Sequence, residues 1–337
     1  MINYVYQLAA PRTFSVKYEE FPFKEEVIIK PRYMSICHAD QRYYTGQRQR
    51  EVMERKLPMA LIHECCGEVL SDATGVYRPG QKVVMIPNVP GEENSEIMEN
   101  YARGAQFLSS GRDGFMREYI GLPADRVVSC EGIAERVAAV MEFVSVAAHS
   151  IRRFKGMAHS QRNRIGIWGD GSLAFVVANL LKREFPQSKL VVIGKNPSKL
   201  SYFSFADEAY LRENLPKTLS VDHAFECCGG DGSYYAIDDI IRLINPQGTV
   251  MLMGVSENKI AINTRDVLEK GLIVVGSSRS GRKDFETAAG YMREARFQRR
   301  LELIIYQDRK VASIEDIHRV FQTDLSTPFK TVFEWGL

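Results

Sequence analysis

The sequence contains few cysteines and no long apolar run. Cysteine accounts for six of the 337 residues, and four of these form two adjacent pairs, Cys65-Cys66 and Cys227-Cys228. So few cysteines exclude a disulfide scaffold and indicate reduced thiols, most of them small buried residues. No apolar run approaches the roughly 18 residues that a membrane-spanning helix needs, and the N-terminal residues lack the features of a secretory signal. We therefore expect a soluble cytoplasmic protein.

An excess of charge of either sign is also missing. The 44 basic and 42 acidic side chains give a net charge of +2, which is not typical of proteins that bind nucleic acid or an anionic membrane. We therefore expect a small-molecule ligand. With 45% apolar residues, the chain is long enough for two packed domains of ordinary size.

Hydrophobic patterning divides the sequence into two textures. Residues 1–142 consist mainly of short alternating or apolar runs bounded by turns, which predicts a mostly β region. In residues 143–282, short apolar runs alternate with helix-length segments, which predicts an α/β domain with a doubly wound parallel sheet. Residues 283–337 contain two helical segments and end in the strand-like FKTVFEW, which we expect to rejoin the first domain. The polar stretch at residues 90–114 has no evident core face and predicts an exposed lobe.

A glycine-rich motif follows the first apolar run of the α/β region. The segment RIGIWGDGSLAFVVANLLKREF places Gly169, Gly171 and Ala174 in the pattern G-x-G-x-x-A between an expected strand and an amphipathic helix. The first glycine permits a tight turn, the second lets the backbone approach a pyrophosphate, and the small third residue packs helix on strand. Ser172 and Leu173 open the helix, whose first amide groups suit a phosphate. The motif in this context predicts dinucleotide binding.

The end of the next expected strand indicates which dinucleotide binds. A site for NAD usually places Asp or Glu there to bind the ribose 2′-hydroxyl, but this sequence reads VVIGKNPSKL, with Lys195 and Asn196 in that place. A carboxylate would repel a 2′-phosphate, whereas Lys195 and the following Lys199 attract it. We therefore expect NADP(H). The alternative interpretation, solvated charges at the start of a helix, leaves the missing acid unexplained.

Two short segments in the β region carry residue types that bind metals. MSICHAD contains Cys37, and LIHECCGEV contains His63 and Glu64. A thiolate, an imidazole and a carboxylate suit zinc, and a catalytic zinc needs three protein ligands with one position left open. The spacing is not a compact C-x-x-C pattern, so the residues alone leave three interpretations open. They are a metal site, a Cys37 nucleophile with His63 as its base, and unrelated polar residues.

Taken in order, several segments resemble the zinc-dependent medium-chain alcohol and polyol dehydrogenases. SICHAD and LIHECCGEV are similar to the family's cysteine and His-Glu segments, and the likeness continues through YRPGQKVVM, DGFMREYI and MEFVSVAAHSIRR. It implies a GroES-like β-rich catalytic domain, formed by residues 1–142 and 283–337. It implies a Rossmann domain, a doubly wound parallel-sheet domain, at residues 143–282.

The same resemblance implies a catalytic zinc and its ligands. The zinc would be held by side chains from Cys37, His63, Glu64 and Glu142, of which Glu142 matches the glutamate of the polyol branch. Whether Glu64 or Glu142 ligates directly stays open. The lobe at residues 87–107, which in many relatives carries four cysteines around a structural zinc, contains none here. We therefore expect one catalytic zinc and no structural zinc.

A second departure from the family concerns the proton. Ala39 stands where alcohol dehydrogenases place a Ser or Thr hydroxyl that begins a proton relay, and alanine cannot serve. The candidates for proton delivery are His38, Tyr43 and a zinc-bound water held by Glu64 or Glu142. Asp40 suits either a part in this transfer or the support of a metal ligand.

Within the family, SICHADQRYYTGQR, KLPMALIHE, SSGRDGFMREY and YFSFADEAYL are similar to the ribulose-5-phosphate reductases, also called ribitol-5-phosphate dehydrogenases. This likeness implies NADPH-dependent reduction of D-ribulose 5-phosphate to D-ribitol 5-phosphate for CDP-ribitol, a precursor of teichoic acids and capsules. It also implies a homodimer and a functional complex with a ribitol-5-phosphate cytidylyltransferase. Two alternatives stay open: a zinc-dependent dehydrogenase of unphosphorylated polyols or alcohols, and a non-catalytic nucleotide-binding relative.

A sugar-phosphate substrate would need cationic side chains near the metal. Arg42 and Arg48 follow the cysteine segment, and Arg279 stands where polyol dehydrogenases bring an arginine to the mouth of the active site. Guanidinium groups bind phosphate in a two-pronged geometry that a lysine cannot form. We expect these three arginines to bind the substrate phosphate. The alternative is that they are surface arginines on a solvated loop.

Overall fold

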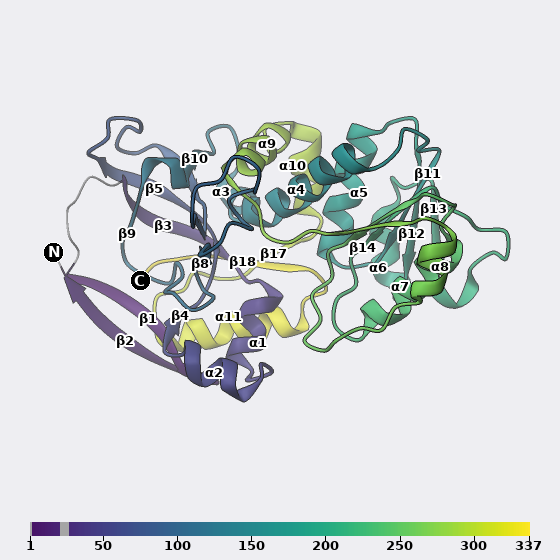
Figure 1. The fold of residues 1–337 in the computed structure, drawn as a ribbon. Helices are drawn as coiled ribbons and strands as arrows, with labels where there is room; N and C mark the ends of the chain where they lie inside the picture. The colour runs from purple at the N-terminus through teal and green to yellow at the C-terminus, as the bar shows by residue number, and fades with distance from the viewer. Residues whose placement is uncertain (1, 21–26) are drawn as a thin grey trace. The chain divides into compact units, whose positions relative to one another are not determined.

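The computed structural model describes residues 2–20 and 27–337 (Figure 1). The chain forms two compact units, one of residues 1–145 with 279–337 and the other of residues 146–278. Within the described ranges, no helix combines the length and the apolar character that crossing a membrane requires.

The limits of the two units differ slightly from those expected after residue 142 and before residue 283. At the first limit, helix α4 (Met141–Met157) runs through the boundary, so no loop marks it. At the second limit, helix α9 (Arg282–Met292) contacts the first unit from its first residue, because the Arg282 N–H donates to Glu99 Oε1 at 2.5 Å.

Strands dominate the first unit, as its alternating sequence pattern indicates. Its largest sheet has the strand order β10-β6-β5-β3-β18-β17, with β9 also paired to β3; another sheet has the order β2-β1-β4, and β7 pairs with β8. The strands are β1 (Ile2–Ala10), β2 (Thr13–Glu20), β3 (Val27–Ser35), β4 (Met59–Ala60), β5 (Glu64–Asp72), β6 (Lys82–Met85), β7 (Asn88–Val89), β8 (Gln106–Phe107), β9 (Ile120–Leu122), β10 (Val127–Ser129), β17 (Ile305–Gln307) and β18 (Lys330–Glu334).

Short helices connect these strands, and longer ones lie near the C-terminus. Besides α4, which begins in this unit, and α9, they are α1 (His38–Tyr44), α2 (Arg50–Lys56), α3 (Glu135–Ala138), α10 (Ala295–Glu302) and α11 (Ile314–Ser326). A buried apolar cluster that includes Met34, Tyr44 and Phe321 joins α1 and α11 to the sheet strands.

The pairing of three neighbouring strands positions the candidate site. β3 pairs antiparallel with β5 and with β18, so that Ser35 lies opposite Glu64 on one side and opposite Val332 on the other. Cys37 follows Ser35 by two residues and Lys330 precedes Val332 by two, so both lie near Glu64. The strand expected in FKTVFEW is thus β18, and it rejoins the first unit as predicted (Figure 1).

The polar stretch at residues 90–114 is only partly exposed, which corrects the expectation of an exposed lobe. Phe107 and Ser109 are buried. Glu99 joins the stretch to the rest of the unit, because it forms an ion pair at 3.0 Å with the buried Arg126 and also accepts the first N–H of α9. The apolar Phe107 and Leu108 are also buried, but they are adjacent rather than periodic, so the sequence pattern did not indicate the burial of this segment.

The second unit is a doubly wound α/β domain, as expected. Its strands are parallel and follow the order β13-β12-β11-β14-β15-β16, which is the order of a dinucleotide-binding fold. The central strands are continuous apolar runs because both faces of such a sheet are covered. The elements are β11 (Arg164–Trp168), α5 (Ser172–Glu184), β12 (Lys189–Gly194), α6 (Pro197–Leu200), β13 (Glu208–Leu211), β14 (His223–Glu226), α7 (Gly232–Leu243), β15 (Thr249–Leu252), α8 (Thr264–Glu269) and β16 (Ile273–Gly276).

Candidate active site

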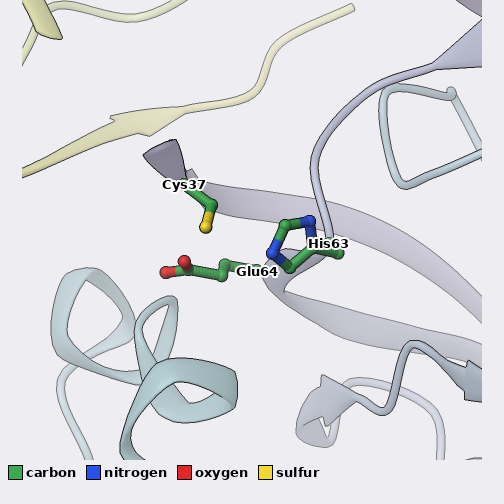
Figure 2. A group of neighbouring side chains, drawn as sticks. All are labelled: Cys37, His63 and Glu64. Carbon is green, nitrogen blue, oxygen red and sulfur yellow. The ribbon is translucent and has the colours of Figure 1, made fainter. Parts of the chain in front are cut away.

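Three candidate metal ligands meet where strand β3 of the large sheet ends and strand β5 begins. Cys37 stands between β3 and α1, His63 precedes β5, and Glu64 is the first residue of β5. One ligand atom of each side chain lies within 4.8 Å of the other two. Figure 2 shows the Cys37 sulfur, the His63 ring and the Glu64 side chain gathered in one place. The register that sets Ser35 opposite Glu64 accounts for this proximity.

The backbone just before His63 is strained. Ile62 has a φ of +68°, in the left-handed region that β-branched residues rarely adopt. Its N–H donates to Asp40 Oδ1 at 3.1 Å, and its carbonyl accepts from the Phe115 N–H at 2.7 Å. A Cβ on Gly114 would lie 2.4 Å from the Ile62 carbonyl oxygen, so this approach requires glycine. Such strain clusters at functional sites, where the surrounding contacts hold it.

Two side chains set the orientation of His63. Its Nδ1 lies 2.7 Å from Ser109 Oγ and 3.5 Å from Asp40 Oδ2. Ser109 Oγ in turn donates to Asp40 Oδ1 at 3.1 Å. With Nδ1 engaged, Nε2 is the ring nitrogen left for a metal. Ser109 belongs to the stretch that was expected to be an exposed lobe, so it was not a candidate from the sequence.

Asp40 is buried and acts as an acceptor for several groups. Besides Ser109 and Ile62, the Cys37 N–H donates to its Oδ2 at 3.3 Å. Burial alone would raise the pKa of Asp40, but the neighbouring His63 and these hydrogen bonds lower it below its usual value. The ionised carboxylate thus supports both Cys37 and His63. Its expected part in proton transfer stays a prediction.

Lys330 reaches the same place from the other end of the sequence. The residue is 5% exposed, and its Nζ lies 2.6 Å from Glu64 Oε1 and donates to the Ile36 carbonyl at 2.8 Å. Burial would lower the pKa of Lys330, but Glu64 and Cys37 raise it above its usual value. The ammonium charge therefore persists beside Glu64. Sequence reasoning missed Lys330 because it lies 266 positions from Glu64 and belongs to no motif.

Glu142, the fourth expected ligand, is not among the side chains whose ligand atoms all lie within 4.8 Å of one another. It lies in the first turn of α4 and is 4% exposed. Burial raises the pKa of Glu142 to about 7, with a further rise from Glu64, while His63 and Lys330 act in the opposite direction. Because these three charges act on it, Glu142 borders the metal-ligand group, and its role as a ligand stays a prediction.

The donor set fits a divalent ion such as zinc. Thiolate, imidazole and carboxylate are the zinc ligands of proteins. Glu64 Oε2 is buried and has no hydrogen-bond partner among the described residues, which is costly unless a cation lies on that side. One oxygen of Glu64 is thus bound by Lys330, and the other is left for an ion.

The candidates for proton transfer and phosphate binding lie in α1 and just after it. His38 is the exposed first residue of α1; partial desolvation of its ring lowers the pKa of His38, and so do the charges of Arg42 and Arg48. Arg48 lies 4.8 Å and Lys56 5.9 Å from the ring centre of the buried Tyr43. Cationic side chains therefore gather around His38 and Tyr43.

An aromatic ring lies between His63 and Arg279, the third arginine expected at the phosphate. Its guanidinium carbon lies 5.1 Å from the ring centre of Phe107, and that ring meets His63 edge to face with 5.2 Å between ring centres. Arg279 has a φ of +57°, and burial lowers its pKa. Its position suits a contact with a substrate beside His63, and this contact stays a prediction.

The glycine motif of the second unit forms a strand, a turn and a helix. Gly169 follows β11 with a φ of +135°, and Gly171 caps the 13-residue helix α5, which begins at Ser172. Ala174 is fully buried, whereas Leu173 is partly exposed. No described atom lies within 4 Å of the place of a Cβ on Gly171. The backbone there has the open space that the approach of a pyrophosphate requires.

The residue between the two glycines makes a contact that the motif does not predict. Asp170 Oδ2 accepts from the N–H groups of Lys195 at 2.7 Å and Asn196 at 2.8 Å. Lys195 and Asn196 are exposed at the end of β12, and Asn196 Oδ1 caps α6 by accepting from the Lys199 N–H at 3.2 Å. The three side chains expected at the adenosine end of the cofactor thus stand on one turn, which Asp170 ties to the glycine loop.

Comparison with known proteins agrees with this architecture along the whole chain. The model of the alcohol dehydrogenase GroES-like domain matches residues 24–132. The chain is 56% identical to the ribulose-5-phosphate reductase of Streptococcus pneumoniae over 338 residues, covering 99% of this chain and 98% of that protein. It is 46% identical to that of Bacillus spizizenii, with complete coverage of both. The structure of Staphylococcus aureus TarJ in complex with NADPH has a TM-score of 0.89 at 44% identity, again over 100% of both chains.

A GroES-like unit and a doubly wound dinucleotide unit together define the medium-chain dehydrogenases, and the expected fold class is confirmed. The metal-ligand group in the first unit is of the kind found in the zinc-dependent members. Within that class, this chain belongs to the ribulose-5-phosphate reductase family. This membership favours the metal site over the nucleophile and base that Cys37 and His63 left open.

Proposed function

We propose that this protein catalyses the NADPH-dependent reduction of D-ribulose 5-phosphate to D-ribitol 5-phosphate. The observation that carries the proposal is the likeness to ribulose-5-phosphate reductases over nearly the entire chain, at 56% and 46% identity. The donor set of Cys37, His63 and Glu64 supports it, because reduction of a ketone needs polarisation of its carbonyl. The product is the precursor of CDP-ribitol, so we place the enzyme in the synthesis of teichoic acid or capsule.

NADPH is the proposed cofactor. The resembling TarJ structure is a complex with NADPH, and in this chain Lys195 and Lys199 stand on the turn where an NAD site would carry an acid. The pyrophosphate would lie against Gly171 and the first turn of α5, which begins at Ser172. When bound, NADPH supplies the hydride.

We further propose one catalytic zinc and no structural zinc. Cys37 and His63 would hold the ion, with Glu64 or Glu142 as the carboxylate ligand, and the lobe at residues 87–107 contains no cysteine for another. When bound, the ion acts as a Lewis acid on the C2 carbonyl of the ketose.

The residues of the first unit position the groups and supply the proton. Reduction adds a hydride to C2 and a proton to O2, which gives the secondary alcohol. Ala39 has no hydroxyl to deliver this proton, so we assign delivery to His38, to Tyr43 or to a water that Glu64 or Glu142 orients. Asp40 holds the ligand backbone and ring in place.

Recognition of the phosphate is assigned to Arg42, Arg48 and Arg279. Arg42 and Arg48 lie near His38, and Arg279 lies near His63 through Phe107. Substitution of Arg279 by methionine should raise KM for ribulose 5-phosphate and leave KM for unphosphorylated ribulose unchanged. Equal changes for both substrates would contradict a phosphate contact.

The test of the proposed function measures NADPH oxidation with ribulose 5-phosphate, ribulose, xylulose 5-phosphate and sorbitol. Preference for ribulose 5-phosphate, lost when a chelator removes the metal and regained with zinc, is the expected result. Equal turnover of ribulose or sorbitol would favour a dehydrogenase of unphosphorylated polyols. NADPH binding without turnover of any substrate would favour a non-catalytic relative. Full activity in metal-free protein would overturn the zinc mechanism.

We also propose that the enzyme is a cytoplasmic homodimer that works with a ribitol-5-phosphate cytidylyltransferase. β16 is the last strand of its sheet, and Ile273 and Val274 on it are exposed, which suits the pairing of an edge strand with a second copy. Light scattering should give twice the mass of the chain, and a monomer at all concentrations would contradict the dimer. Co-purification with the cytidylyltransferase tests the complex.

A further inference from the structure

The Asp170 side chain occupies the space beside the end of β12. It accepts hydrogen bonds from the N–H groups of Lys195 and Asn196. It also fills the space next to Gly194, where an added Cβ would lie 2.7 Å from the Cβ and the Oδ2 of Asp170. An NAD site directs a carboxylate of this strand at the ribose. Here the carboxylate comes from the glycine loop and is directed at the backbone amides of the turn.

A second cationic residue follows the strand that pairs with β12. In the parallel pairing of β12 with β13, Gly194 lies opposite Leu211. The residues that follow each strand are Lys195 and Arg212, so they emerge side by side at the carboxyl edge of the sheet. Doubly wound folds bind their dinucleotide along this edge. Arg212 belongs to no sequence motif, and its proximity to Lys195 depends on the strand pairing.

Arg212 is held in place by two contacts. Its Nε donates to Asp239 Oδ2 at 2.5 Å, and its guanidinium carbon lies 5.1 Å from the ring centre of Tyr235. The bond to Asp239 uses Nε, so within the described part of the chain the two terminal amino groups are left to bind an anion. A guanidinium fixed in this way loses less conformational freedom when it binds a phosphate.

The Cys228 thiol lies within the electrostatic reach of the same charges. Packing around the sulfur raises the pKa of Cys228; the carboxylates of Glu226 and Asp170 raise it further, whereas Lys195 and Arg212 lower it. Asp170, Lys195 and Arg212, which follow β11, β12 and β13, therefore all lie near the Cys228 thiol.

We propose that Lys195 and Arg212 together bind the 2′-phosphate of NADPH and that Asp170 is a positioning residue that fixes the Lys195 backbone. The proposal rests on the proposed use of NADPH. Arg212 shares the Asp239 carboxylate with Arg242, so part of its positive charge stays available to a phosphate. Two backbone N–H groups stabilise the Asp170 carboxylate, which weakens its attraction for the cations.

The test measures binding of NADPH and NADH to the full-length, metal-loaded protein by fluorescence of the reduced nicotinamide. Arg212→Met should weaken NADPH about tenfold, as expected for the loss of one charge-assisted bond, and leave NADH nearly unchanged. Arg242→Met is the matched control, because Arg242 donates to the other oxygen of the same Asp239 at 2.9 Å but is not among the charges that act on Cys228. It should bind both cofactors as the wild type does.

The positioning role of Asp170 is separated from its charge by two substitutions. Asp170→Ala removes the acceptor and should weaken NADPH about tenfold, whereas Asp170→Asn keeps an acceptor oxygen and should stay within about threefold of the wild type. Equal affinity in Asp170→Ala and the wild type would contradict the positioning role. Equal losses in the Ala and Asn variants would contradict it as well.

Competition with adenosine 2′,5′-bisphosphate and adenosine 5′-monophosphate isolates the 2′-phosphate. The wild type should prefer the bisphosphate, and Arg212→Met should lose most of that preference. A wild type that binds NADH as tightly as NADPH would contradict the proposed cofactor itself. A wild type that prefers NADPH, with a preference that Arg212→Met leaves intact, would overturn only the present inference.

Discussion

Lys330 Nζ lies 2.6 Å from Glu64 Oε1, so the last strand of the chain supplies a counter-charge to a candidate metal ligand. The pair is buried, and its surroundings include the thiol of Cys37 and the carboxyl of Glu142. An ion pair in such a place matters chiefly when one partner is removed, because the remaining charge is then buried alone.

Substitution of Lys330 by methionine keeps the apolar stem and removes the ammonium. In the metal-free protein we expect the free energy of unfolding to fall by about 3 kcal/mol, as when one partner of a buried pair is lost. Urea denaturation measures this change. Combined with Glu64→Gln, the loss should be smaller than the sum of the two single losses. Strictly additive losses would show that the two side chains do not interact.

Ser109 should control how well the site retains its metal. Removal of its hydroxyl in Ser109→Ala takes away the partner 2.7 Å from His63 Nδ1, and loss of such support typically lowers metal affinity about 10- to 100-fold. Competition with a chromophoric chelator gives the affinity. Ser110→Ala is the control, because the neighbouring Ser110 bonds to Lys56 instead. Equal affinities in the two variants would argue against the role of Ser109.

Gly114 should tolerate no side chain. The Cβ of Gly114→Ala would meet the carbonyl oxygens of Leu61 and Ile62 at 2.4 Å, which forces the strained backbone before His63 to shift. We expect a loss of about 1–3 kcal/mol in the free energy of unfolding, together with weaker metal binding. Gly156→Ala in α4 meets no atom within 4 Å and should be neutral or slightly stabilising. A stable Gly114→Ala protein with full metal affinity would refute the requirement.

His223 makes part of the stability depend on pH. It is fully buried, and its Nδ1 accepts from the Thr249 N–H at 3.0 Å. Burial lowers the pKa of His223 to about 4, helped by the charges of His159 and Arg162 and opposed by a hydrogen bond with the His159 backbone and by the charge of Asp222. An unfolded histidine has a pKa of about 6.5, so the unfolded chain binds more protons between these values. Stability is therefore full above about pH 6.5 and is lost as the pH falls toward 4, by about 3 kcal/mol in total.

Substitution of His223 by asparagine tests this dependence, because the amide oxygen of Asn can still accept from the backbone. The free energy of unfolding of the wild type should fall more steeply with decreasing pH than that of His223→Asn, by about one proton in the slope over this window. Denaturant titrations at a series of pH values provide the slopes. Parallel curves for the two proteins would mean that His223 does not carry the effect.

The sequence predicted the parts of the fold that depend on local pattern. The glycine motif at Gly169 and Gly171 lies between a strand and a helix as expected, since tight turns and helix starts are set by a few neighbouring residues. The alternation of runs and helices predicted the doubly wound sheet for the same reason. The motif segments also named Cys37, His63 and Glu64, which the strand register then brings together.

Contacts between distant segments were not predictable in this way. Lys330 joins the metal-ligand group because β18 pairs with β3. Ser109 joins it from a polar stretch in which the neighbouring Leu108 is also buried. Arg212 stands beside Lys195 only through the register of β12 with β13. None of these residues has a periodicity or a motif, so their roles become visible only in three dimensions.

The ion pair of Glu99 with Arg126 bears on how the protein withstands metal loss. The pair and the bond from the Arg282 N–H of α9 join the lobe to the rest of the unit through side chains and backbone. Removal of the catalytic ion should then leave a protein that is inactive but still folded. Such a protein should regain its activity when the metal is returned, without new protein synthesis.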